Sequence, residues 1–262
     1  MSTLADRSIA ALRTTHDELA AVVPTLPDKQ LTGPSGASEW TVAQVLSHLG
    51  SGAEIALAGY RAALDGEPAP GQDFNESVWD RWNALSPEQQ ATGFLEHDSV
   101  VVLALEALSV EQRENTTVKL GFLPAPLPLT SAIGMRLNET AQHSWDVRVA
   151  VDRQAKLGAD AAEVLVDHYT GGLGFLLGRL GKADQLPEPA VIAVADSGGA
   201  IVVDNSLGLS RSAPEPTARF DGELEAALRL LGGRLKAPYV PPGLQVTGNV
   251  TLADLQRAFP GY

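Results

Sequence analysis

Well-marked helix starts constrain the fold of this chain more than any other feature of its sequence. Thr41 and Gln44 have the spacing of a capping box, in which each side chain satisfies a backbone N–H group at the start of a helix. Residues 86–89 (Ser-Pro-Glu-Gln) repeat that pattern with a proline in the first helical position. These signals predict one helix over residues 41–64 and another from 87 to about 109.

The remainder of the first half is also predicted to be helical. An apolar stripe predicts a helix over residues 3–23 that Pro24 ends, and a short helix is expected over 74–84. Residues 115–129 contain three prolines, which suits an extended connection. Thr130 is expected to cap a last helix that ends near Val151. Helices joined in this way favour a bundle.

The second half has a different pattern. After a helix predicted over residues 160–181, two β-rich runs at 191–195 and 200–204 flank Asp196-Ser-Gly-Gly199, which indicates a hairpin. Further elements are expected as strands over 217–220 and 244–247 and as helices over 223–231 and 252–259. The predicted fold is therefore mainly α, with a helical bundle over residues 1–155 followed by a smaller α+β domain over 156–262.

Composition excludes several function classes. The formal net charge is −13 and no cluster of Lys and Arg offsets it, so a nucleic acid is an unfavourable partner. No stretch reaches the roughly 18 apolar residues of a membrane span, and a signal-peptide pattern is absent, which predicts a cytoplasmic protein without a membrane partner. The chain has no cysteine. Any metal must therefore be held by nitrogen and oxygen, and any thiol must come from outside.

One motif carries candidate chemistry. Glu139 and His143 are four residues apart in a predicted helix, so their side chains are neighbours on one face and can bind one cation. His48, in another predicted helix, can supply a third ligand. Two imidazoles and a carboxylate suit Zn²⁺, and three protein ligands leave an open position, as in catalytic zinc sites. Asp146 is placed to orient an imidazole.

Plainer interpretations exist for these residues. A Glu–His pair on a helix often only faces solvent, and Trp40 and Trp145 are expected in the core or in a hydrophobic staple. The remaining histidines have no partner at ligand spacing and are expected at the surface or at the edge of the core: His16, His97 and His168. Residues 171–174 (Gly-Gly-Leu-Gly) are interpreted as glycines inside a helix, because no strand precedes them as in a phosphate loop.

Two segments resemble a known family. Residues 40–49 (Trp-Thr-Val-Ala-Gln-Val-Leu-Ser-His-Leu) and residues 138–146, with Asn138, Glu139, His143 and Asp146, are similar to the mycothiol-dependent maleylpyruvate isomerase family. Residues 220–234 and 246–249 resemble that family's C-terminal part. The resemblance implies a DinB-like four-helix bundle followed by a sterol-carrier-like α+β domain that covers the site, and zinc held by His48, Glu139 and His143.

The resemblance also implies the cofactor and the chemistry. Mycothiol, a sugar thiol of actinobacteria, would supply the sulfur that the chain lacks, and a metal-bound thiol is deprotonated at neutral pH. In the isomerases the thiolate adds to the cis double bond of maleylpyruvate, the resulting single bond rotates, and elimination gives the trans product. Relatives are thought to transfer the thiol to other small electrophiles. The expected protein is a monomer or small homo-oligomer acting on an anionic or electrophilic small molecule.

An arginine completes the predicted site. Arg234 resembles the arginine of the family's C-terminal Gly-Arg motif, where a guanidinium can hold a substrate carboxylate by a two-pronged hydrogen bond. The alternative is an arginine that pairs with the last carbonyls of a helix. Arg81, Arg136 and Arg148 are further candidates that are expected to be surface residues.

Three functions remain open at this stage. The first is a mycothiol-dependent isomerase or S-transferase. The second is a zinc hydrolase that needs no thiol. The third is a noncatalytic bundle that binds a small ligand or a partner protein, because preserved ligands demonstrate a site and not a reaction.

Overall fold

The computed structural model describes residues 2–121, 123–204, 206–213 and 215–261. The chain divides into two compact units, Met1–Arg153 and Gln154–Tyr262. The predicted boundary between residues 155 and 156 lies two positions after this division.

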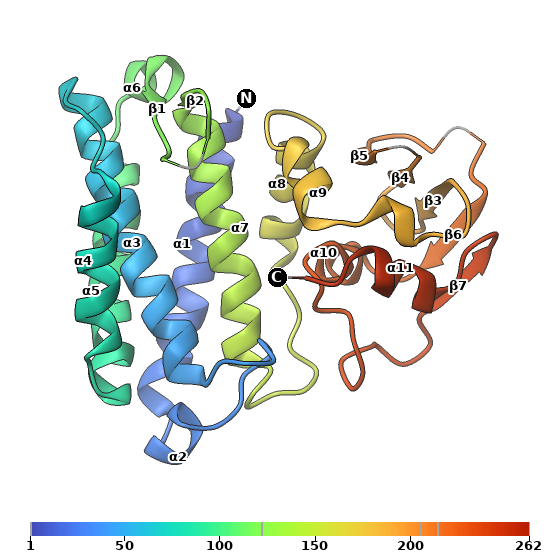
Figure 1. The fold of residues 1–262 in the computed structure, drawn as a ribbon, viewed down its shortest axis with the longest axis horizontal. Helices are drawn as coiled ribbons and strands as arrows, with labels where there is room; N and C mark the ends of the chain where they lie inside the picture. Colours follow the sequence, from blue (N-terminus) through green and yellow to red (C-terminus); the bar gives the residue numbers. More distant parts are fainter. Residues whose placement is uncertain (1, 122, 205, 214, 262) are drawn as a thin grey trace. The chain divides into compact units, whose positions relative to one another are not determined.

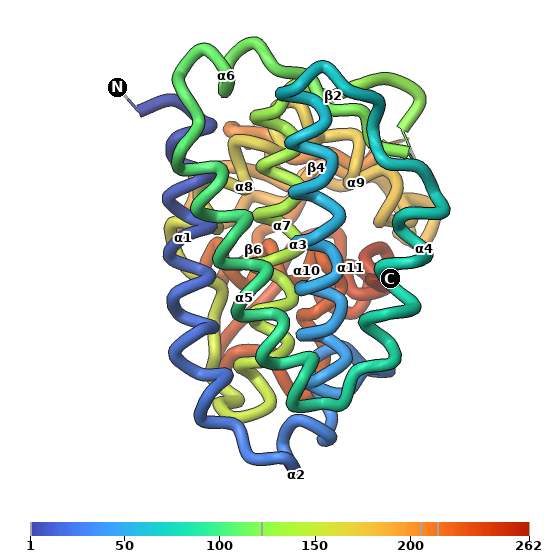
Figure 2. The backbone as a smooth tube through the Cα atoms, turned by 90° about the vertical axis from the view of Figure 1, so that its left-hand side faces the viewer, coloured from blue at the N-terminus to red at the C-terminus, as the bar shows by residue number. Residues whose placement is uncertain are grey.

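The first unit is a helical bundle. In the part of the chain that the structure describes, its four long helices are α1 (Leu4–Val22), α3 (Val42–Asp65), α5 (Pro87–Glu106) and α7 (Leu129–Arg148). They run side by side in Figures 1 and 2, with α3 packed on α5 and α1 packed on α7. The shorter elements are η1 (Val23–Thr25), α2 (Asp28–Leu31), α4 (Gln72–Asn83), α6 (Val110–Asn115) and the paired strands β1 (Thr117–Val118) and β2 (Leu127–Pro128). The expected bundle class is confirmed.

The helix starts follow the predicted chemistry. Thr41 and Ser86 are the N-caps of α3 and α5, and in both capping boxes the two reciprocal hydrogen bonds are present. Helix α3 ends at Gly66, whose φ of 73° is a left-handed conformation that glycine adopts without steric cost. Since both ends of α3 are specified locally, the position of His48 along it is set by the sequence.

The bundle core is built from buried aliphatic and aromatic side chains. Leu46 and Leu49 on α3 and Phe94 on α5 are 0% exposed and belong to one apolar cluster. Burying each such side chain contributes roughly 1.5–3 kcal/mol, so these contacts hold α3 against its neighbours. A glycine helps the packing, because a Cβ added at Gly50 would lie 2.1 Å from the ring of Trp82. The indole therefore lies directly on the α3 backbone.

Two helix predictions were wrong. Thr130 does not cap α7, whose N-cap is Pro128; the Thr130 hydroxyl instead donates to the carbonyl of Arg113. The helix expected over residues 160–181 is divided into α8 (Ala159–Tyr169) and α9 (Phe175–Leu180). The break falls in the glycine-rich segment 171–174, since glycine is a poor helix former and exposes the backbone to other hydrogen bonds.

The second unit combines a mixed sheet with helices. Its strands are β3 (Ala190–Val194), β4 (Ala200–Val203), β5 (Leu207–Ser210), β6 (Ala218–Asp221) and β7 (Gln245–Gly248), in the order β5-β4-β3-β6-β7. The predicted β3–β4 hairpin is present, β6 runs parallel to β3, and β5 was not predicted. The other elements are η2 (Ala183–Gln185), α10 (Leu224–Leu231) and α11 (Leu252–Ala258). Helix α10 packs on α8 within this unit.

None of the described helices has both the length and the apolar composition that crossing a membrane requires. Along α1 and α5 one face is buried and the other carries exposed residues, whereas every residue of α7 is buried or partly buried.

Candidate metal centre

Three potential metal ligands converge in the bundle. His48 lies on α3, and Glu139 and His143 lie one turn apart on α7. Each offers one ligand atom, and these atoms all lie within 4.8 Å of one another; among the described residues no other group of three His, Cys, Asp or Glu does so. The structure thus brings together all three residues that the sequence analysis selected as metal ligands.

Glu139 lies between the two imidazoles. Its Oε2 is 3.1 Å from His48 Nε2 and 3.6 Å from His143 Nε2, and the two imidazole centroids are 4.7 Å apart. The side chains of His48 and Glu139 are 38% and 35% exposed, whereas that of His143 is 8% exposed. The cluster is therefore anchored in the bundle on one side and accessible to small molecules on the other.

Asp146 orients His143. Its carboxylate is fully buried, and its Oδ2 lies 2.9 Å from His143 Nδ1. A proton on Nδ1 donated to this carboxylate leaves the lone pair of Nε2 directed to the cluster, which is the arrangement of metal-ligating histidines. The Gly36 N–H donates to the Asp146 carbonyl, and a Cβ at Gly36 would meet Trp145 and Asp146 at 2.8–2.9 Å. Only glycine allows this close approach of the loop to α7.

Trp40 flanks the cluster. Its ring centroid lies 5.0 Å from that of His48 and 5.8 Å from that of His143, and its plane is inclined by 26° to the His143 ring. The Trp40 carbonyl accepts a hydrogen bond from the Ser35 hydroxyl, which helps to hold the loop. Trp145 is buried as expected, but Trp40 is 38% exposed and is not a core residue. Its position directly before the N-cap of α3 could have indicated that Trp40 lies beside the site, because His48 is near the same end of that helix.

The donor set fits a small divalent cation. Bonds of about 2.0–2.2 Å at tetrahedral angles separate neighbouring ligand atoms by about 3.3–3.6 Å. The distances from Glu139 to the two histidines, 3.1 and 3.6 Å, are close to that range. Two imidazole nitrogens and one carboxylate oxygen suit Zn²⁺ better than Mg²⁺ or Ca²⁺, which prefer oxygen ligands.

The other histidines lie outside this cluster. His97 is at the surface with its Nδ1 3.6 Å from a Glu54 carboxylate oxygen, in agreement with the prediction. His16 and His168 are 6% and 1% exposed, so the expectation of a surface or core-edge position was wrong for both. Sequence spacing did not reveal the partner of His16, which is Asp98 on another helix.

The candidate arginines differ in burial. The Arg81 side chain is 51% exposed and pairs with Glu54, as expected of a surface residue, and the Arg148 side chain is 17% exposed. Arg136 is buried and pairs with Asp98, so its expected surface position was wrong. Arg234 lies just after α10, where its Nη1 donates to the Gly232 carbonyl. That bond is of the kind expected for an arginine near a helix C-terminus.

Comparisons with known proteins place these features in context. The family model described as the mycothiol maleylpyruvate isomerase N-terminal domain matches residues 12–148. Two uncharacterized proteins of Mycobacterium tuberculosis are each 25% identical over 150 residues, which are 56% of this chain and 69% of theirs. Crystal structures of a mycothiol-dependent maleylpyruvate isomerase and of its histidine-to-alanine mutant match with a TM-score of 0.62. The identity is 16% over 95% of this chain and 98% of the other, so this match shows the fold.

Proposed function

This chain belongs to the mycothiol maleylpyruvate isomerase family, and from this premise we propose that it is a zinc enzyme that uses mycothiol to act on a small electrophilic acid. The observation that carries the proposal is the convergence of His48, Glu139 and His143 from two helices on one point. The proposed reaction is isomerisation of a cis-unsaturated oxo acid of the maleylpyruvate type or transfer of the thiol to a small electrophile.

The proposed ligands have different roles in binding the metal. His143, buried and oriented by Asp146, is the rigid ligand, and Glu139 supplies the negative charge between the two imidazoles. His48 brings the second helix to the site. Zinc bound there would supply a Lewis acid at which a coordinating thiol is deprotonated at neutral pH. Because the chain has no cysteine, this thiol would have to be brought by the cofactor.

Arg234 is proposed to bind a substrate carboxylate. Its guanidinium carries five N–H donors in a planar fork, and its Nη1 donates to the Gly232 carbonyl. This role predicts that Arg234→Lys raises KM for an acidic substrate at unchanged zinc content, because a lysine ammonium cannot form the two-pronged bond. An unchanged KM would assign Arg234 to the helix end alone.

Metal content is the first test. We expect about one zinc per chain, measured by plasma mass spectrometry, on untagged protein prepared without chelator. His48→Ala and His143→Ala are expected to lose it while the circular dichroism spectrum keeps its helical form. His97→Ala is the matched control, because it removes an exposed histidine outside the cluster. Zinc retained in full by both ligand variants would overturn the proposed site.

The thiol dependence is tested next. We expect turnover of maleylpyruvate only when mycothiol is present, and an assay of free thiol distinguishes the two reactions, since isomerisation regenerates the thiol and transfer consumes it. Hydrolysis of an ester without thiol would favour a zinc hydrolase. Zinc binding without turnover in any of these assays would favour a noncatalytic binding bundle.

A further inference from the structure

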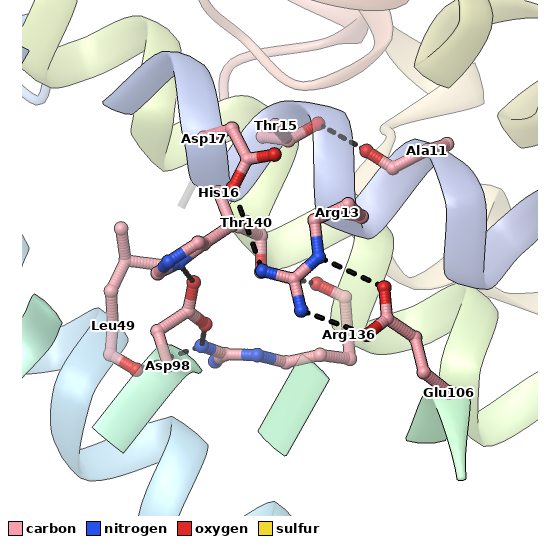
Figure 3. Close-up of polar contacts among 10 residues, drawn as sticks. All are labelled: Ala11, Arg13, Thr15, His16, Asp17, Leu49, Asp98, Glu106, Arg136 and Thr140. Atoms are coloured by element: carbon pink, nitrogen blue, oxygen red, sulfur yellow. Dashed lines mark hydrogen bonds and ion pairs between the residues drawn. The ribbon is translucent and has the colours of Figure 1, made fainter. Parts of the chain in front are cut away.

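A second polar cluster, fully inside the bundle, joins its four long helices. His16 on α1 and Arg136 on α7 both contact Asp98 on α5, and Figure 3 shows the Asp98 carboxylate between them. His16 Nδ1 lies 2.7 Å from Asp98 Oδ2, and Arg136 Nη2 donates to Asp98 Oδ1 over 2.5 Å. The same Nη2 donates to the carbonyl of Leu49 on α3 over 3.0 Å. One nitrogen thus links α7 to both α5 and α3.

The charges of this cluster are balanced inside the bundle. Asp98 is 0% exposed and Arg136 is 6% exposed. Burial by itself raises the pKa of the Asp98 carboxyl, but the Arg136 guanidinium and the hydrogen bond with His16 outweigh burial and hold that pKa below its ordinary value. Asp98 is therefore ionised at neutral pH and keeps the guanidinium in place.

Stability alone is a weak explanation for this arrangement. Buried ion pairs often contribute no more stability than well-packed apolar side chains of the same volume. Within the described residues, Arg136 Nε is also buried without a hydrogen-bond partner, which has a cost. A buried polar group retained under these conditions calls for a further role.

The α3 helix is shaped to receive the guanidinium. A Cβ added at Gly52 would lie 3.2 Å from Arg136 Nη1, so the glycine leaves the room that this side chain occupies. The Tyr60 hydroxyl forms another tie between the same helices by donating to the Ala132 carbonyl over 3.2 Å. From Leu49 to Tyr60 along α3, the partners on α7 run backwards from Arg136 to Ala132. The two helices are therefore antiparallel, and these hydrogen bonds set their register.

The contact with Leu49 adjoins the candidate metal centre. Leu49 follows His48 directly on α3, and Arg136 precedes Glu139 by three residues on α7, or about 4.5 Å of helix rise. Positions i, i+3 and i+7 share one helix face, so Arg136, Glu139 and His143 all lie on the side of α7 that faces α3. The guanidinium therefore holds α3 within one turn of the site.

We propose that Arg136 is a positioning residue for the metal centre: by bonding to both the Leu49 carbonyl and Asp98, it sets the register of α3 against α7 and thereby the place of His48. This inference deepens the proposed function and rests on it. His48 is the ligand whose distance from the other two depends on helix packing, since Glu139 and His143 share α7. Ligand distances must lie within about 0.2 Å of their optimum, so a small slip of α3 weakens binding.

The test compares zinc affinity with folding. The double variant Arg136→Met/Asp98→Asn removes both charges, keeps an acceptor for His16, and loses the bond to the Leu49 carbonyl. Its zinc dissociation constant, measured on folded protein by competition with a chromophoric chelator, is expected to rise by about tenfold or more, as for partners that orient ligands. Bound Co²⁺ is expected to show an altered visible spectrum.

Two further variants separate register from general stability. Leu105→Ala opens a cavity on α5, which carries no proposed ligand; it is expected to lower the free energy of unfolding and to leave zinc affinity within twofold. Arg136→Lys keeps the positive charge beside Asp98, but its ammonium falls one bond short of the Nη2 position. We expect Arg136→Lys to bind zinc more weakly than wild type. If the double variant does not fold, the zinc affinity of Arg136→Lys alone tests the positioning role.

The outcomes distinguish the two proposals. Wild-type protein that binds no zinc would overturn the proposed function and this inference with it. Wild-type zinc binding with unchanged affinity in the folded Arg136 variants would overturn the positioning role alone. An equal loss of affinity in Leu105→Ala would also overturn it, because the effect would then follow stability and not register.

Discussion

Two of the bundle's polar clusters, His16–Asp98–Arg136 and His48–Glu139–His143, each place a histidine against a carboxylate and differ in the third group. At the buried cluster, His16 and Asp98 are joined by Arg136, with side chains 7%, 1% and 5% exposed. At the candidate metal centre, His48 and Glu139 are joined by His143, and the first two are more than one-third exposed. The same pairing of an imidazole with a carboxylate therefore occurs in a buried and in a partly exposed environment.

The third group decides what each cluster can bind. A guanidinium is always charged and has no lone pair, so Arg136 neutralises Asp98 and closes the buried cluster to cations. A neutral imidazole offers a lone pair, so His143 adds a metal ligand beside Glu139 where Arg136 adds a fixed positive charge beside Asp98. A second imidazole beside a histidine and a carboxylate thus favours a metal site, and a guanidinium beside them disfavours one.

The largest expected contrast between the clusters is in stability. Asp98→Ala leaves the buried Arg136 charge without its partner, and we expect the free energy of unfolding to fall by about 3–5 kcal/mol, a large part of the total for a domain. Glu139→Ala removes a half-exposed carboxylate, and its expected effect is below about 1 kcal/mol. Urea unfolding with chelator present measures both; equal losses would contradict the comparison.

The next expected effect is on metal affinity. Asp146→Asn keeps an oxygen near His143 Nδ1 but removes the negative charge that raises the basicity of the imidazole, so zinc affinity is expected to fall about tenfold. Titration against a chromophoric chelator measures this change. Asp17→Asn, an exposed position on α1, is the control and is expected to bind zinc as wild type does. No loss in Asp146→Asn would show that His143 is oriented by other contacts.

The smallest expected effect is a pH dependence of stability. Because the pKa of Asp98 is lowered in the folded protein by Arg136 and His16 against the effect of burial, its contribution to stability is fully present above the unfolded pKa of about 3.9. That contribution is lost as the pH falls through the lower pKa of the folded state.

The difference in unfolding free energy between wild type and Asp98→Asn should therefore narrow on acidification. Urea unfolding at several values between about pH 2 and 5 measures this difference. The other carboxylates titrate in both proteins, so their contributions to the unfolding free energy cancel in it. A difference that stays constant across this range would mean that Asp98 is not held ionised by its neighbours.

The predictable parts of the fold were those with local causes. The predicted capping boxes at Thr41 and Ser86 depend on residues three positions apart, and both are present. The division between α8 and α9 was missed because apolar periodicity continues through the glycines of residues 171–174. Strand β5 was missed because it is a short edge strand that pairs with β4 alone, and its pairing depends on the sheet.

The candidate site was likewise predictable only where its cause is local in the sequence. The spacing of Glu139 and His143 is enough to place them on one helix face, while His48 was a candidate third ligand whose approach depends on how the helices pack. Arg136 and His16 were assigned to the wrong environment, because their common partner Asp98 is 38 and 82 positions away in the sequence. No local pattern reports such a contact.

The sequence by itself determined where α3 and α5 begin, which residues share a helix face, and that any thiol must come from outside the chain. These properties depend on short-range hydrogen bonds, on the helical repeat and on composition. The tertiary structure alone decided that His48 meets Glu139 and that Arg136 meets Asp98 and the Leu49 carbonyl. The physical reason is that the register between packed helices is set by side chains far apart in the chain, through burial and buried charge.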